Sequence, residues 1–257
     1  MLDANNFVYK AYQDSRVKSH PGFVEGQSGP LLLATHKETG EKYIVKHTYR
    51  HNAANEYAAC WLSSKLGLLT PKAFLLSGDG PFSSKQVVAI SFIEGFSAPN
   101  INNLSVDQQE ELIGQLAFNM LIESGDRLQL RIAGGHMYSF DFSEAFYISD
   151  ETLYKTILYD EETGVSMVGQ RVSAFRSNLH FKNFDMPDVA KVFGLEPEKL
   201  KIGMFTVAKR VLDITDDDIE EMSAELMDIY PVAYGIYYEE CVRAIQDRVR
   251  ALKDGDA

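Results

Sequence analysis

The sequence has few of the features that mark secreted, membrane-spanning or disulfide-stabilised proteins. Only two cysteines occur among 257 residues, Cys60 and Cys241, and their context suggests neither a disulfide nor a zinc site, so we expect two buried thiols. No apolar run approaches the ~18 residues that a membrane-spanning helix needs. The N-terminal stretch MLDANNFVYK lacks the basic flank and the apolar run of a secretory signal. These absences predict a cytoplasmic protein.

Several signatures of nucleotide and metal enzymes are also absent. The sequence contains no GxxxxGKS/T, no GxGxxG and no HExxH motif, which argues against Walker-type nucleotide enzymes, Rossmann dehydrogenases and zinc peptidases. Its six histidines show no ligand spacing with cysteines or acidic residues. His47 and His51 are close in sequence, but we expect them to straddle a loop between a strand and a helix. No histidine metal site is therefore expected.

Positive charge is scarce. The chain has 25 lysines and arginines against 37 aspartates and glutamates, a net charge of −12. A surface this acidic repels phosphate backbones and anionic lipids, so neither nucleic acid nor a membrane is expected as a partner. Residues 213–230 alone contain eight acids and no base. We interpret this stretch either as the solvated face of a helix or as a docking surface for a basic partner.

The first third of the chain alternates strand-like runs with turn residues. Two apolar runs, 31–34 and 42–46, flank the polar turn KETG and predict a hairpin. A helix is expected over 52–66, because this alanine-rich stretch ends in a glycine and, soon after, a proline. Further strands are expected over 73–76 and 86–93. The pattern predicts a small, sheet-based lobe with one helix.

Beyond this lobe the pattern becomes helical. Ser105 and Gln108 have the spacing of a capping box that opens a helix. Two short alternating runs on either side of an AGG triplet predict a second hairpin. The last third is mostly helix, with Asp216–Asp218 in a first turn, where the helix dipole favours them. The predicted fold class is therefore α+β, with a sheet-based N-lobe over 1–96 and a mainly helical C-lobe over 97–257.

Lys46 is a candidate for binding an anion. It ends an apolar strand and shares a face with Ile44, where burying an ammonium group is costly without an anionic partner. Glu56, in the following predicted helix, is a natural partner. Protein kinases hold a strand lysine with a helix glutamate in this way, so that the lysine contacts nucleotide phosphates. The alternative interpretation is a peripheral lysine and a solvated glutamate.

Two aspartates flank the second predicted hairpin. Asp126 follows a long helix in the stretch SGDR, where its carboxylate could orient or deprotonate a hydroxyl group. Asp141 stands between Phe140 and Phe142, where a metal ion is one way to stabilise a carboxylate. Because the two aspartates lie at the outer ends of one hairpin, we expect them to lie close together.

A glycine-bearing loop, GQSGP, precedes the first predicted strand of the hairpin. Gly26 and Gly29 would let the backbone approach a phosphate group, and the Ser28 hydroxyl could donate to it. An ordinary surface turn is the alternative interpretation of this loop.

In this order, the features resemble the HipA-like kinase family, which shares its fold with protein kinases and, more distantly, with phosphoinositide kinases. The resemblance covers roughly residues 22–147. It is carried by GQSGPLLL, GEKYIVK, NEYAACWLSSKLGLLTPKAFLL, SFIEG, SGDR and FDFSEAF. It implies a two-lobed protein-kinase-like fold and an activity that uses ATP and Mg²⁺.

The resemblance also implies roles for the matching positions. Lys46, fixed by Glu56, would clamp the phosphates, Asp126 would be the catalytic aspartate, and Asp141 would bind the metal. The loop that covers the phosphates would be formed by Gly26, Ser28 and Gly29. The hinge that contacts the adenine would be formed by Phe92, Ile93 and Glu94.

One stretch departs from the family pattern. The family has Asp-Arg-His-x-x-Asn, whose asparagine binds a metal ion, whereas this chain has Leu128 and Arg131 at the histidine and asparagine positions. Gln129 shares a strand face with Arg131 and could supply the missing oxygen ligand. Alternatively, Arg131 could place its guanidinium where a second cation would sit, leaving one magnesium ion on Asp141. In a third interpretation the site has lost phosphotransfer.

The features and the resemblance together imply an ATP- and magnesium-dependent phosphotransferase of the HipA-like type, specifically a serine/threonine kinase that acts on a protein. The alternative is a pseudokinase that binds nucleotide, a protein partner or both without phosphotransfer. A further interpretation is a kinase fold that transfers the nucleotide part or acts on a small molecule. The sequence identifies neither the substrate nor the partner.

Overall fold

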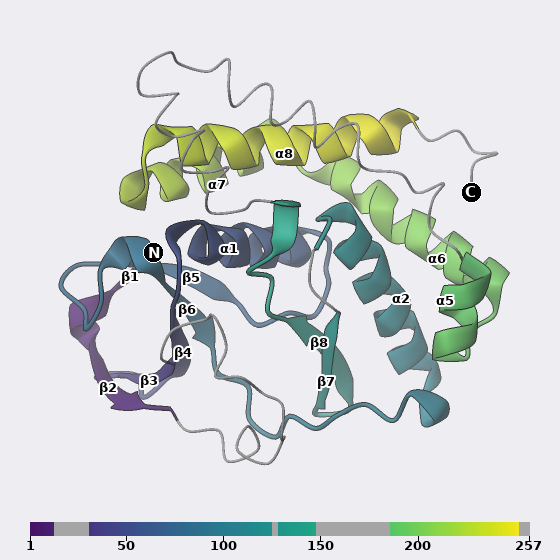
Figure 1. The fold of residues 1–257 in the computed structure, drawn as a ribbon, viewed down its shortest axis with the longest axis horizontal. Helices are drawn as coiled ribbons and strands as arrows, with labels where there is room; N and C mark the ends of the chain where they lie inside the picture. Colours follow the sequence, from purple (N-terminus) through teal and green to yellow (C-terminus); the bar gives the residue numbers. More distant parts are fainter. Residues whose placement is uncertain (13–30, 125–127, 148–185, 252–257) are drawn as a thin grey trace.

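The computed structural model describes residues 1–12, 31–124, 128–147 and 186–251. Within these ranges, the N-terminal half is a curled sheet with one long helix, and the C-terminal part is mainly helical (Figure 1). This two-lobed α+β arrangement confirms the predicted fold class. None of the helices in the described part of the chain is long and apolar enough to cross a membrane.

A six-stranded sheet forms the N-terminal lobe. Its strands are β1 (Leu2–Asp3), β2 (Phe7–Ala11), β3 (Leu31–His36), β4 (Lys42–His47), β5 (Ala73–Ser77) and β6 (Val87–Ser91). Their order in space is β1-β5-β6-β4-β3-β2, and every neighbouring pair is antiparallel except β1 and β5. The predicted β3–β4 hairpin and the strands β5 and β6 are confirmed. β1 and β2 were not predicted, and β6 is shorter than the predicted range 86–93, with a 3-10 turn at Ser84–Gln86 directly before it.

Helix α1 (Arg50–Lys65) lies between the sheet and the C-terminal helices (Figure 1). It is buried on nearly all sides, and small residues at Ala53, Ala54, Ala58 and Ala59 let its neighbours approach closely. As predicted, the helix is followed by a glycine, Gly67, whose φ of 70° belongs to the left-handed region that favours glycine. The helix thus forms part of the largest hydrophobic core of the molecule.

The C-terminal lobe begins with α2 (Val106–Leu121). The predicted capping box is confirmed, since Ser105 Oγ accepts from the Gln108 amide at 3.2 Å and Gln108 Oε1 accepts from the Ser105 amide at 3.1 Å. The predicted hairpin follows as β7 (Gln129–Ala133) and β8 (His136–Phe140), with Gln129 opposite Phe140. A second core joins α2 and the hairpin to α5 (Met186–Phe193) and α6 (Pro197–Lys209).

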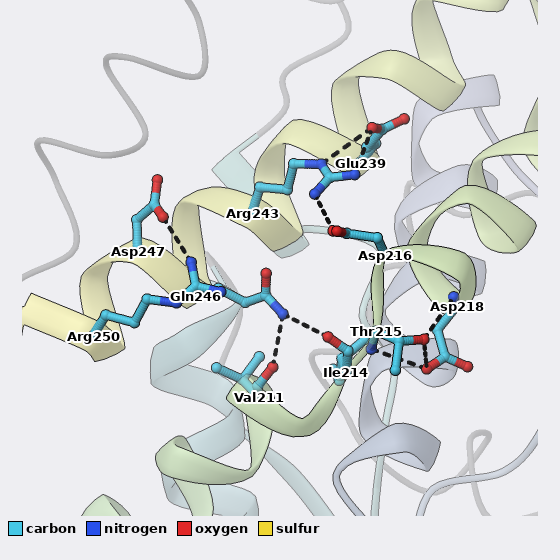
Figure 2. Close-up of polar contacts among 10 residues, drawn as sticks. All are labelled: Val211, Ile214, Thr215, Asp216, Asp218, Glu239, Arg243, Gln246, Asp247 and Arg250. Carbon is cyan, nitrogen blue, oxygen red and sulfur yellow. Dashed lines mark hydrogen bonds and ion pairs between the residues drawn. The ribbon is translucent and has the colours of Figure 1, made fainter.

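The lobe ends with α7 (Asp216–Ile229) and α8 (Val232–Ala251), which pack along each other (Figure 1). Figure 2 shows how side chains of α8 fasten the segment before α7: the amide nitrogen of Gln246 donates to the backbone carbonyls of Val211 at 3.1 Å and Ile214 at 2.8 Å. Arg243 joins Glu239 of its own helix to Asp216 of α7. Part of the acidic stretch is therefore paired within the molecule.

Both cysteines lie in helices. Cys60 in α1 and Cys241 in α8 are buried and form no disulfide. Burial raises the pKa of the Cys60 thiol well above its ordinary value, so this side chain stays neutral. This confirms the expectation of two buried thiols.

Candidate functional site

Lys46 reaches the site from the last part of β4. Residues of this strand alternate, so that Tyr43 and Val45 are buried in the core of the N-lobe while Ile44 and Lys46 lie on the other face. The Lys46 ammonium nitrogen lies 3.2 Å from Glu56 Oε2 and 3.0 Å from Asp141 Oδ1. Two carboxylates thus offset the cost of removing this charge from water.

Glu56 connects the lysine to the second hairpin. It projects from the middle of α1, its side chain is 2% exposed, and its Oε2 atom accepts a further hydrogen bond of 2.9 Å from the backbone amide of Phe142. Phe142 directly follows Asp141. One carboxylate oxygen of Glu56 therefore holds both the lysine and the backbone beside the aspartate.

Asp141 lies just beyond the end of β8, in an unusual backbone conformation. Its φ of 68° is in the left-handed region, where aspartate and asparagine are the least disfavoured residues after glycine. Its two oxygens have separate partners: Oδ1 accepts from Lys46, and Oδ2 accepts from the Gln129 amide nitrogen at 2.8 Å. Such strained positions are concentrated at functional sites.

Lys46, Glu56 and Asp141 shift one another's pKa values. Burial alone would lower the pKa of Lys46, but the charges of Glu56 and Asp141 raise it above its ordinary value, so the ammonium form is retained. Burial raises the pKa of Glu56, and Lys46 offsets part of that effect. The charge of Lys46 lowers the pKa of Asp141 despite its burial. Asp141 is therefore an ionised carboxylate at neutral pH.

A buried hydrogen-bond network holds α1 and the segment after Asp141 together. The side-chain amides of Asn52 and Asn55 donate to the carbonyl oxygen of Ser143 at 3.1 and 2.7 Å. The Tyr238 hydroxyl, from α8, donates to Asn55 Oδ1 at 2.6 Å. No sequence motif pointed to these residues. The available signal was the unusual presence of two asparagines and a glutamate within an alanine-rich helix.

The three residues predicted to contact adenine form the connection that leaves β6. The Phe92 amide donates to the Lys42 carbonyl at 2.9 Å, and the exposed Glu94 carboxylate pairs with the Lys42 side chain at 2.9 Å. The chain then turns toward the second hairpin, where Ser97 and Ile132 exchange backbone hydrogen bonds of 3.0 and 2.9 Å. The segment after Phe92–Glu94 is thus fastened to β7.

The structure brings four of the candidate residues into direct contact, Lys46, Glu56, Gln129 and Asp141. Gly26, Ser28 and Gly29 of the predicted phosphate loop lie outside the described residues, as does Asp126, so its expected proximity to Asp141 stays a prediction. Among the residues that are described, no cluster of three or more His, Cys, Asp or Glu side chains could hold a metal ion. Gln129 directs its amide nitrogen toward Asp141.

Comparison with known proteins supports the fold. No family model matches the sequence, and no curated protein matches it. Among solved structures, nine chains match, one of which is the crystal structure of the Helicobacter pylori proinflammatory kinase CtkA. That structure has a TM-score of 0.55 and 12% sequence identity, and the similarity covers 95% of this chain and 97% of that chain. The chain therefore has a kinase-like, two-lobed fold.

Proposed function

We propose that this chain is an ATP- and magnesium-dependent phosphotransferase of the HipA-like type, acting on a serine or threonine hydroxyl of a protein. The observation that carries the proposal is the set of contacts from Lys46 to both Glu56 and Asp141 within a kinase-like fold. Phosphoryl transfer requires a cation that binds the phosphates and a carboxylate that binds the metal ion. Lys46 and Asp141 provide these two groups.

The donor chemistry of Asp141 suits magnesium. Mg²⁺ prefers oxygen ligands and is usually bound by one or two carboxylates together with substrate phosphates. Asp141 is ionised and about one-third of its side chain (34%) is exposed, so it can exchange a nitrogen partner for a cation. When bound there, magnesium would neutralise charge on the transferred phosphoryl group.

The remaining roles are those that the resemblance to HipA-like kinases implies. Lys46, fixed by Glu56, binds the phosphates, and the loop with Gly26, Ser28 and Gly29 covers them. The adenine lies against the connection Phe92–Glu94. Asp126 orients the attacking hydroxyl and accepts its proton. The nucleotide site thus lies between the proposed lobes 1–96 and 97–257.

A test that separates binding from transfer uses the purified chain and an Asp126→Asn variant. Thermal melting with ATP, with and without millimolar magnesium, measures binding, because a ligand at a hundredfold excess over its Kd stabilises the folded state by ~2.7 kcal/mol. Transfer of the labelled γ-phosphate to protein measures catalysis. We expect both proteins to show a magnesium-dependent shift in Tm and only the wild type to transfer phosphate. The absence of any shift in the wild type would refute the proposal.

The alternative function is a pseudokinase, which the side chain of Arg131 favours. Arginine provides no ligand for a metal ion, and the neighbouring Gln129 uses its amide nitrogen on Asp141. A wild-type protein whose melting shift with ATP does not need magnesium, and which transfers no phosphate, would support this function. The partner in that case would be a protein.

A further inference from the structure

The half-buried side of the β7–β8 hairpin contains a cation that the proposed mechanism has not used. Paired residues of the two strands share a face, and the side chains of Leu130, Met137 and Ser139 are buried in the core. The opposite, half-buried face carries Gln129, Arg131, Tyr138 and Phe140. The contact of Gln129 with Asp141 shows that this face borders the candidate site.

The guanidinium of Arg131 is held in place before any ligand arrives. Its central carbon lies 5.2 Å from the centre of the Phe140 ring, and one terminal nitrogen donates to the Leu130 carbonyl at 2.8 Å. Phe140 in turn stacks on Phe96, with ring centres 5.9 Å apart and an interplanar angle of 18°. A guanidinium fixed by an aromatic face loses little conformational freedom when it binds an anion.

Arg131 has no acidic partner in the described part of the chain. Other bases of this acid-rich protein pair with carboxylates, as Lys42 does with Glu94 and Lys65 with Asp218. Among the described residues, the Arg131 side chain has the aromatic contact with Phe140 and the hydrogen bond to the Leu130 carbonyl. A half-buried guanidinium with free N–H groups is suited to bind the oxygens of a phosphate in a bidentate manner.

Asp141 is the more exposed of the two carboxylates that contact Lys46, with 34% of its side chain exposed against 2% for Glu56. Protein kinases hold two magnesium ions, one on the aspartate after the hairpin and one on an asparagine of the catalytic loop. Here Gln129 acts as a donor to Asp141, and the Oε2 atom of the buried Glu56 is engaged with Lys46 and the Phe142 amide. Arg131 lies two residues beyond Gln129 on the same face, ~7 Å along the strand.

We propose that Arg131 binds the phosphate chain of the nucleotide and provides the positive charge of a second metal ion, so that the site works with a single divalent cation on Asp141. This inference rests on the proposed function and specifies its substrate contact. It predicts that affinity depends on Arg131 for nucleotides that carry a phosphate chain, and much less for adenosine monophosphate.

The first experiment counts metal ions. Mn²⁺ replaces Mg²⁺, the ligand is a non-hydrolysable ATP analogue, and bound Mn²⁺ is measured by electron paramagnetic resonance in the wild-type chain. One Mn²⁺ per bound nucleotide supports the inference, and two would overturn it. This count needs no variant, so it remains decisive even if substitutions at Arg131 impair folding.

The second experiment measures affinity by calorimetry for ADP and AMP in the presence of magnesium. Arg131→Gln is expected to bind ADP roughly 10- to 100-fold more weakly, as expected for the loss of a charge-assisted contact, while AMP binding changes less. Arg131→Lys, which keeps the charge but not the planar fork, is expected to be intermediate. The matched control is Arg250→Gln, an exposed arginine of α8, which should bind like the wild type.

Equal ADP affinity in Arg131→Gln and the wild type would overturn the inference and leave the proposed function intact. Failure of the wild type to bind any nucleotide would overturn both. The outcomes therefore distinguish an error in the role of Arg131 from an error in the function of the site.

Discussion

The ammonium nitrogen of Lys46 lies 3.0 Å from Oδ1 of Asp141, although the two residues are 95 positions apart in the chain. Lys46 belongs to the sheet of the N-lobe, and Asp141 follows the hairpin of the C-lobe. Their ion pair spans the two lobes without any ligand. A bound nucleotide with a metal ion would therefore replace an existing contact, in which each residue exchanges its partner for a group of opposite charge.

Asp141→Asn tests this exchange without disturbing the backbone. Asparagine tolerates the left-handed φ of 68° about as well as aspartate, so the variant should fold. Its neutral amide is a weaker ligand for Mg²⁺, and we expect the magnesium-dependent part of the melting shift with ATP to disappear. Asp79→Asn, at an exposed aspartate, is the matched control and should melt like the wild type. An unchanged magnesium dependence in Asp141→Asn would contradict the role of Asp141.

The stability difference between the wild type and Asp141→Asn is expected to depend on pH. The charge of Lys46 lowers the folded-state pKa of Asp141 below its ordinary value of 3.8. A carboxyl group with a lowered pKa stabilises the folded state above its unfolded pKa, and this contribution is lost as the pH falls through the folded pKa. The difference in free energy of unfolding between wild type and Asp141→Asn should therefore shrink on acidification below ~3.8. Urea unfolding at neutral and acidic pH measures it, and a difference that stays constant would rule out the ion pair.

The sequence predicted the parts of the fold that have local signals. The capping box of Ser105 and Gln108, the glycine after α1 and the two hairpins each depend on residues a few positions apart, so the pattern contains the whole interaction. The alternation of β4 also placed Lys46 on the same face as Ile44. β1 was missed because it has only two residues, and β2 because its sequence, FVYKA, does not alternate apolar and polar residues.

The contacts that fix the site could not be predicted in the same way. Tyr238 and Asn55 are 183 positions apart, and no spacing in the sequence signals their hydrogen bond. For Gln129, the shared face with Arg131 followed from strand alternation, but the direction of its amide did not. That direction depends on where the left-handed backbone of Asp141 places the carboxylate, which is set by tertiary packing.

Gln246→Met is expected to destabilise the C-terminal lobe. The substitution keeps the approximate size of the buried side chain but removes the donor to the Val211 and Ile214 carbonyls, which lie just before α7 (Figure 2). Leaving buried carbonyls unpaired should lower the free energy of unfolding by roughly 1–3 kcal/mol in urea titrations. Gln86→Met, the same change at an exposed glutamine, is the control and should be nearly neutral. Equal stability of the two variants would show that the hydrogen bonds of Gln246 contribute nothing to the free energy of unfolding.

Two buried tyrosines near each other in the chain provide a matched test of the buried hydrogen-bond network that holds α1 and the segment after Asp141 together. The Tyr238 hydroxyl donates to Asn55 Oδ1, whereas the buried Tyr230 hydroxyl makes no hydrogen bond to any described residue. Tyr238→Phe should therefore cost ~1–2 kcal/mol in the free energy of unfolding, because it leaves the asparagine oxygen unpaired, and Tyr230→Phe should be neutral. Denaturant unfolding distinguishes the two.

The functional consequence of Tyr238→Phe follows from the next contact. Asn55 also donates to the Ser143 carbonyl, two residues after Asp141, so a loosened asparagine should let Asp141 and Glu56 move. We expect weaker binding of ATP with magnesium in Tyr238→Phe at a temperature where both variants are folded, and unchanged binding in Tyr230→Phe. If Tyr238→Phe loses stability but keeps its full affinity, the network supports the fold alone, and the position of Asp141 depends on Glu56 and Gln129.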